Sequence, residues 1–247
     1  MKKVINYSLK LFFCFIAILF FSSDKAKASH AMGADITYEY VGPNQYLVTF
    51  SFYRDCNGIP APSSIDLDIN NSCGFATQTV FLNPLPSSPT QIDPVCPTEL
   101  STCNGGNYTG IEEWIYQGVV TLPGACADWT FSHGESARNS AITTITGAGS
   151  DILYVYTLLN NTNGITDNSP LFSNRPVPFA CVGQRFCFNH GAFDLEGDSI
   201  TYQLITPLTS QNSTVTYLAG YSNTQPVLSS PPVQFNAVSG DICMTPT

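Results

Sequence analysis

Apolar and polar residues alternate along short runs of this 247-residue sequence, and this alternation limits the fold more than any other feature. In residues 45–53, QYLVTFSFY, every second position is large and apolar, and these positions share one face (Tyr46, Val48, Phe50, Phe52). A period of two is typical of a half-buried strand. Long helical periodicity is absent, so the sequence predicts an all-β fold.

Turn residues divide the alternating runs. Gly42-Pro43-Asn44 separates residues 45–53 from a second alternating run, residues 34–41, and we therefore expect a hairpin there. Short strands punctuated by Gly, Pro, Asn and Ser about every ten residues are typical of β-sandwiches. Residues 160–169 are polar and turn-rich. The pattern predicts two immunoglobulin-like β-sandwich modules in tandem, residues 29–165 and 166–247.

The first residues have the features of a secretory signal peptide. Lys2 and Lys3 precede an apolar run over residues 11–21, which is too short to span a bilayer. Ala26-Lys27-Ala28 supplies the small residues of a cleavage site, so we expect residues 1–28 to be removed after Ala28. No later segment has the length and hydropathy of a membrane helix. The sequence predicts a protein secreted to the cell exterior.

Removal of the signal peptide leaves a strongly acidic chain. Four basic residues remain, all arginine, against seventeen acidic ones, which gives a formal net charge of −13. Nucleic-acid binding depends on lysine and arginine contacts with phosphates, so the charge argues against DNA or RNA as a partner. It also disfavours anionic lipid surfaces and is compatible with cations.

Eight cysteines follow the signal peptide (Cys56, Cys73, Cys96, Cys103, Cys126, Cys181, Cys187, Cys243). An even number in an exported chain predicts disulfides, whereas the absence of a C-x-x-C pair argues against zinc. Sequence alone does not give the connectivity. Cys56 with Cys73 and Cys96 with Cys103 are plausible local bridges, because turn-rich segments separate the members of each pair. Cys181 and Cys187 are too far apart in one straight strand to pair with each other.

An acidic turn joins two alternating runs within residues 186–204. Asp194, Glu196 and Asp198 surround Gly197, which tolerates the positive φ of a tight turn. Three carboxylates on a short loop provide the hard oxygen ligands that Ca²⁺ prefers, although the spacing is not that of an EF-hand. A solvated hairpin turn without an ion is the alternative interpretation.

The segment Asp167-Asn168-Ser169-Pro170-Leu171-Phe172, followed by residues 192–202, AFDLEGDSITY, resembles a cadherin-type repeat. In that family the linker and the acidic turn hold calcium at a domain junction. The resemblance implies that Asp167, Asn168, Asp194 and Glu196 are calcium ligands. Together with Asp198 from the acidic turn, these residues form our candidate calcium site.

Most of the remaining chain is similar to the N-terminal region of very large surface proteins of Bacteroidetes. The similarity lies in residues 29–62, 104–123, 126–143, 176–202 and 240–246. Those proteins often end in a gliding-motility-associated C-terminal sorting domain and use type IX secretion. The resemblance implies an adhesin-like surface protein, and it makes the strands of Cys187 and Cys243 neighbours that a disulfide could bridge.

The second module ends early by comparison with these families. Residues 233–244 resemble the middle of a cadherin or immunoglobulin-like module, and the sequence stops before the last two strands of such a sandwich. We therefore expect a fragment that continues into further domains of a longer chain, or a module that borrows a strand.

No nucleophile elbow, zinc-protease motif, P-loop or dinucleotide fingerprint is present, so we expect no enzymatic activity. The favoured hypothesis is a structural or binding module that meets an unknown protein or glycan at the cell surface. A carbohydrate-binding module that uses Trp114 and Trp129 as stacking platforms is the alternative. A glycoside hydrolase that uses Glu112 and Glu113 with the Asp194 group is a third, weaker hypothesis.

Overall fold

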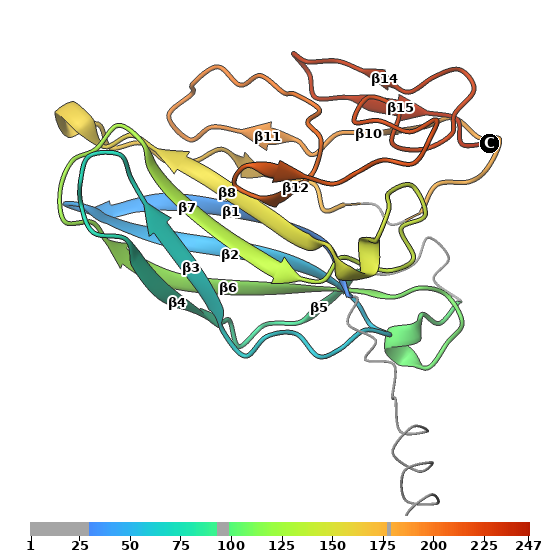
Figure 1. Cartoon of the computed structure of the whole chain (residues 1–247), viewed down its shortest axis with the longest axis horizontal. Coiled ribbons are helices and arrows are strands. Elements are labelled where there is room, and N and C mark those ends of the chain that lie inside the picture. The colour runs from blue at the N-terminus through green and yellow to red at the C-terminus, as the bar shows by residue number, and fades with distance from the viewer. Residues whose placement is uncertain (1–29, 93–98, 177–178) are drawn as a thin grey trace, which may run out of the picture.

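The computed structural model describes residues 30–92, 99–176 and 179–247, and its regular structure is almost entirely β (Figure 1). The prediction of an all-β fold is confirmed. The predicted signal peptide, residues 1–28, and Cys96 lie outside the described residues. We call residues 30–165 the first part and residues 166–247 the second part.

In its described residues, the first part contains eight strands and three short 3₁₀ turns. The strands are β1 (Ala31–Gly42), β2 (Gln45–Asp55), β3 (Ile65–Asn70), β4 (Gln78–Pro84), β5 (Thr90–Ile92), β6 (Ile111–Thr121), β7 (Trp129–Ser136) and β8 (Ile152–Leu159). The 3₁₀ turns are η1 (Thr102–Asn104), η2 (Ala148–Ser150) and η3 (Thr162–Gly164). The predicted hairpin is confirmed, because β1 and β2 pair in antiparallel register around a turn at Asn44, where φ is 56°.

The strands form two layers that share one continuous strand order, β1-β2-β6-β4-β3-β7-β8-β12-β13. β4 connects the layers, because Asn83 and Pro84 pair with β6 while the residues before them pair with β3. Figure 1 shows β3, β7 and β8 crossing over β1, β2 and β6. The first part is therefore a β-sandwich in which β1 and β8 are the strands at the open side.

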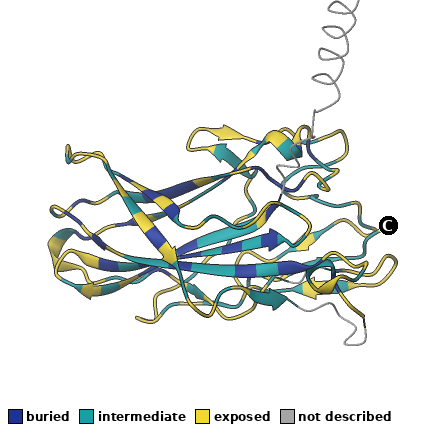
Figure 2. Cartoon of the chain, turned by 90° about the horizontal axis from the view of Figure 1, so that it is seen from below, coloured by how far each residue is buried: buried dark blue, intermediate teal, exposed yellow. Residues whose placement is uncertain are grey.

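The core lies between these layers and is rich in aromatic side chains. On β2 the alternation predicted from sequence is observed, since every second residue from Tyr46 to Arg54 is buried. The largest fully buried side chains include Trp129, Tyr46, Tyr116, Phe50, Phe52 and Phe131. Complete burial of one such side chain stabilises the fold by about 1.5–3 kcal/mol. Figure 2 shows the buried residues concentrated along these long strands.

Among its described residues, the second part has only short strands and no buried apolar core of its own. Its strands are β9 (Leu171–Phe172), β10 (Phe186–Phe188), β11 (Ala192–Phe193), β12 (Leu208–Ser210), β13 (Ser213–Thr214), β14 (Gln234–Phe235) and β15 (Ile242–Met244). Within the described residues of this part, Val215 is the one buried apolar side chain, and it packs on Ile145 and Ala148 of the first part.

The second part is attached to the first by backbone pairing. Leu208 on β12 pairs with Tyr154 on β8, and Thr146 N–H donates to the Thr216 carbonyl at 2.9 Å. β12 therefore extends the sheet of the first part. The division into two immunoglobulin-like modules at residues 165 and 166 stays a prediction.

Three disulfides are formed, and two of them differ from the local bridges expected from sequence. Cys56 pairs with Cys103 and Cys73 pairs with Cys126. The expectation of Cys56–Cys73 and Cys96–Cys103 bridges was wrong because sheet pairing brings distant loops together. The full-length β2–β6 ladder places the residues after β2 beside those before β6, and Cys56 N–H donates to the Gly110 carbonyl at 3.0 Å.

The bridge between Cys187 and Cys243, which the family resemblance implied, is confirmed. These residues lie directly opposite each other in the β10–β15 pair. Cys181 is exposed and has no disulfide partner among the described residues.

Candidate cation site between the two parts

The linker after the first part lies along the edge of β1. Tyr38 N–H donates to Ser169 Oγ at 2.8 Å, and Ser169 N–H donates to the Tyr38 carbonyl at 2.9 Å. Tyr40 N–H donates to Asn168 Oδ1 at 2.6 Å. These bonds satisfy backbone groups that point away from β2, and they fix the linker on the first part.

The acidic turn is brought to this linker by a two-residue ladder. Ala192 and Phe193 of β11 pair with Phe172 and Leu171 of β9. The turn that follows is closed by Asp194, whose Oδ1 accepts the N–H groups of Glu196 at 3.0 Å and Asp198 at 2.9 Å. Gly197 has a φ of 85°, which explains why glycine occupies the turn.

Three of the predicted ligands come together. Asp167 of the linker and Asp194 and Glu196 of the turn each offer a carboxylate oxygen, and these three oxygens lie within 4.8 Å of one another. Calcium binds oxygen at about 2.3–2.6 Å, so two of its ligands are at most about 5 Å apart. The spacing and the hard oxygen donors fit a calcium ion, which would require further oxygen ligands such as water.

The other two predicted ligands, Asn168 and Asp198, do not belong to this cluster of three carboxylates. Asn168 Oδ1 already accepts the N–H of Tyr40, and its Nδ2 donates to Glu196 Oε1. Asn168 thus orients a carboxylate while its own oxygen is engaged. The Asp198 carboxylate is not one of the three clustered groups, although its charge acts on Asp167.

The electrostatics of the cluster are unfavourable in the absence of a cation. Burial raises the pKa of Asp167, and the negative charges of Glu196, Asp194 and Asp198 raise it further. No arginine of the described residues reaches the cluster, because each one bonds elsewhere (Arg54 with Glu112, Arg138 with the Leu208 carbonyl, Arg175 with Glu113, Arg185 with Gln234). No lysine follows residue 28, so the described residues provide no counterion to this cluster.

Two other clusters of ligand-type residues contain cysteines that are already paired. Cys56 and Cys103 lie beside Glu112, and Cys73 and Cys126 lie beside Asp128. A disulfide sulfur is not a thiolate, and the thiolate is the form that binds metal. These clusters therefore do not offer metal sites in the oxidised protein.

The residues proposed for sugar binding are engaged in the fold. Trp129 is fully buried and stacks on Phe75 with ring centroids 5.4 Å apart, so its faces are not available to a sugar. Trp114 is half-buried, and its Nε1 donates to Glu112 Oε2 at 3.0 Å.

The two glutamates considered for hydrolysis each form an ion pair with an arginine. Glu112 pairs with Arg54 at 2.7 Å and Glu113 pairs with Arg175 at 2.9 Å. Glu113 and Arg175 thereby form an ion pair between the two parts.

A buried polar cluster in the first part was not expected from sequence. His133 Nδ1 lies 2.9 Å from the Asp66 carbonyl, and its Nε2 lies 3.3 Å from Glu135 Oε2. The other oxygen of Glu135 is 3.6 Å from Nε2 of the buried His30. Burial lowers the pKa of His133, but the contacts with Glu135 and Asp66 outweigh it and raise the pKa overall. The local sequence HGES gives no sign of this cluster, because His30 lies more than a hundred residues away.

Comparisons with known proteins found no match among family models, curated proteins or solved structures. In the part of the chain that the structure describes, no helix has the length and hydropathy needed to cross a membrane.

Proposed function

We propose that this chain is a non-enzymatic structural or binding module of an extracellular, adhesin-like surface protein, and that calcium stiffens the junction between its two parts. The observation that carries the proposal is the cluster of Asp167, Asp194 and Glu196. It joins the linker to the turn of the second part, and no basic side chain among the described residues neutralises it.

The division of work between these residues follows from their positions. Asp167, Asp194 and Glu196 would hold the ion, and calcium supplies the positive charge that offsets their repulsion when it is bound. Asn168 and Ser169 fix the linker to β1 through hydrogen bonds that need no ion. The turn that carries Asp194 would then be held against the first part.

A stiff junction matters because the second part has little core with which to hold itself in place. Its attachment depends on Val215, the short β12 pairing and the Arg175–Glu113 ion pair. An ion at the linker adds a further constraint on the second part. In a surface protein, such modules hold a binding region at a distance from the cell.

The extracellular location is part of the proposal and is supported by two kinds of observation. Disulfides persist mainly in oxidising compartments, and three are formed here. The resemblance to large surface proteins of Bacteroidetes covers most of the chain after the predicted signal peptide. That resemblance also favours type IX secretion and a longer parent chain.

Thermal unfolding with and without calcium tests the proposal. A ligand that binds only the folded state at about 100 times its Kd stabilises that state by about 2.7 kcal/mol. For a chain of this size and a Kd of about 10⁻⁴–10⁻³ M, we expect about 10 mM Ca²⁺ to raise Tm by about 3–10 °C relative to a chelator.

Two variants make the test specific. The increase should disappear in Asp194→Asn and persist in Glu99→Gln, which removes one charge from an exposed position. An equal calcium response in both variants, or no response in the unmodified protein, would contradict the proposal.

A further inference from the structure

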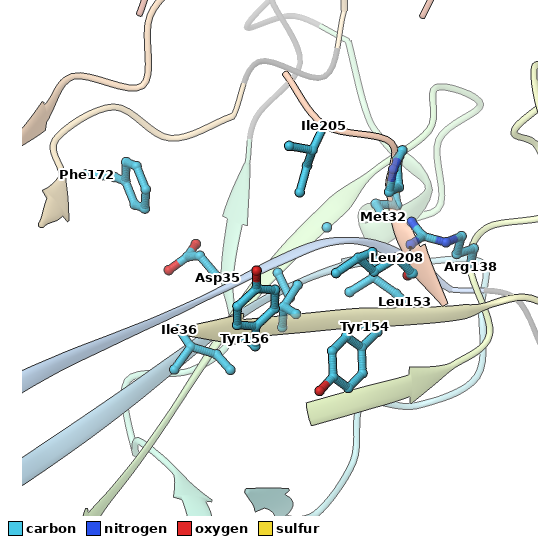
Figure 3. Close-up of a pocket in the computed structure, with 14 residues that line it drawn as sticks. Met32, Asp35, Ile36, Arg138, Leu153, Tyr154, Tyr156, Phe172, Ile205 and Leu208 are labelled. Carbon is cyan, nitrogen blue, oxygen red and sulfur yellow. Dashed lines mark hydrogen bonds between the residues drawn. The ribbon is translucent and has the colours of Figure 1, made fainter. Parts of the chain in front are cut away.

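Two adjacent cavities lie where the second part covers β1. Their volumes are about 430 and 560 Å³, and both are lined by Met32, Asp35 and Phe172. Figure 3 shows the first cavity, with Asp35, Ile36 and Tyr156 on one side and Phe172 and Ile205 facing them across the space. The first cavity lies along the gap between β1 and β8.

The β1 edge in this gap carries backbone groups without partners. The N–H and carbonyl of Tyr38 bond to Ser169, so they point away from β2. Residues two and four positions earlier in a strand have the same orientation, so the backbone groups of Ile36 and Ala34 also point away from β2. None of the described residues bonds to them. An unpaired strand edge of this kind is a template for an added strand.

The protein itself uses both sides of the gap for such pairing. On β1, the linker at Ser169 bonds to Tyr38, just beyond the unpaired stretch. On β8, Leu208 pairs with Tyr154. The unpaired stretch from Met32 to Ile36 lies between these two attachments, and it is long enough for about five residues of extended chain.

Polar groups in the first cavity set the chemistry of an occupant. Asp35 lines both cavities, and the nearby Glu113 is already paired with Arg175. Arg138 is 8% exposed, and its buried Nε has no hydrogen-bond acceptor among the described residues. A ligand that places a cation at Asp35 and a carbonyl or carboxylate oxygen near Arg138 would complement both.

We propose that the gap between β1 and β8 binds an extended peptide segment of a partner protein, which adds a strand to β1 at Ala34 and Ile36. On an added strand, the residue opposite Asp35 projects on the same face as that carboxylate, so it should be basic. Its two neighbours lie opposite Ala34 and Ile36, project between the layers, and should be small and apolar. The inference rests on the proposed function only in taking the protein to be a binding module.

A defined peptide tests this inference by fluorescence anisotropy. The peptide is a labelled, terminally blocked pentapeptide with a central lysine, valine on both sides of it and threonine at both ends. We expect saturable binding that weakens at least about tenfold when the backbone of both valines is N-methylated, because methylation removes the strand hydrogen bonds and keeps the side chains.

A second comparison isolates the charge pair. Replacing the central lysine by norleucine should weaken binding to the unmodified protein but not to Asp35→Asn. Asp68→Asn, which removes an exposed carboxylate on the outer face of β3, should bind both peptides as the unmodified protein does. Melting curves confirm that each variant is folded.

Several outcomes would overturn the inference. Undiminished binding of the N-methylated peptide, or a lysine preference that persists in Asp35→Asn, would exclude strand addition beside Asp35. Binding of the apolar dye anilinonaphthalene sulfonate that the peptide does not displace would identify a small-molecule cavity instead. Failure to bind peptide, alongside a normal calcium response, would overturn this inference and leave the calcium proposal intact.

Discussion

Tyr38 and Ser169, 131 residues apart in sequence, form a reciprocal contact in which the Tyr38 N–H donates to Ser169 Oγ and the Ser169 N–H donates to the Tyr38 carbonyl. Tyr38 lies on the edge strand of the sandwich, and Ser169 lies one residue beyond the part of the linker that carries Asp167 and Asn168. The contact is buried. It determines where the acidic turn meets the first part, and it leads to the first prediction.

Replacing Ser169 with alanine removes the oxygen that accepts the Tyr38 N–H. A buried donor without a partner costs about 1–3 kcal/mol, so we expect Ser169→Ala to lower the free energy of unfolding by that amount. Urea unfolding followed by tryptophan fluorescence measures the change. Ser213→Ala, at an exposed position, is the matched control and should have no effect. Equal stability of the two variants would show that the linker is not held by this bond.

Asp35 gives a prediction about pH. Burial raises its pKa to about 6 from an ordinary value near 3.8, and the charge of Glu113 also raises it. A carboxyl group with a raised pKa binds more protons in the folded state, so its contribution to stability falls as pH rises from about 4 to 6. Above pH 6 the ionised carboxylate costs the folded state about 2–3 kcal/mol.

Asp35→Asn removes this cost. We expect the variant to be more stable than the unmodified protein at about pH 7.5, with a difference that shrinks as pH is lowered towards about 4. Urea midpoints measured for both proteins across this range provide the test. A stability difference that does not change with pH would indicate that Asp35 does not titrate in this way.

The Cys187–Cys243 disulfide closes a loop with a sequence separation of 56 in the part of the chain that lacks its own core. Chain-entropy arguments predict that a loop of this length contributes about 4 kcal/mol. We expect Cys187→Ser with Cys243→Ser to make the second part sensitive to limited proteolysis, while the first part stays resistant. Cys181→Ser, which removes an exposed cysteine that has no disulfide partner among the described residues, should be indistinguishable from the unmodified protein. Proteolysis at equal rates in all three proteins would contradict this prediction.

Local periodicity in the sequence was sufficient to predict much of the first part. The β1–β2 hairpin follows from period-two alternation around Asn44, because alternation is a local property of the chain. The pairing of Cys56 with Cys103 was not predictable in the same way. It depends on β6 lying beside β2, and that neighbour relation is a property of the whole sheet.

The candidate site shows the same division between local and long-range information. The resemblance to cadherin repeats selected Asp167, Asp194 and Glu196, which the structure places together. It also selected Asn168, whose oxygen is already bonded to Tyr40 on a strand far away in sequence. No sequence pattern indicated that Asp35 is buried, because an acidic residue in an alternating strand resembles any solvent-facing position. Its burial arises only when the second part covers β1.

Direct measurement of calcium binding by isothermal titration calorimetry tests the central claim that an ion joins the two parts. We predict one site per chain with a Kd of about 10⁻⁴–10⁻³ M, the range typical of extracellular modules, and no binding by Asp167→Asn with Glu196→Gln. The absence of binding to the unmodified protein, or the same binding to the double variant, would contradict the account.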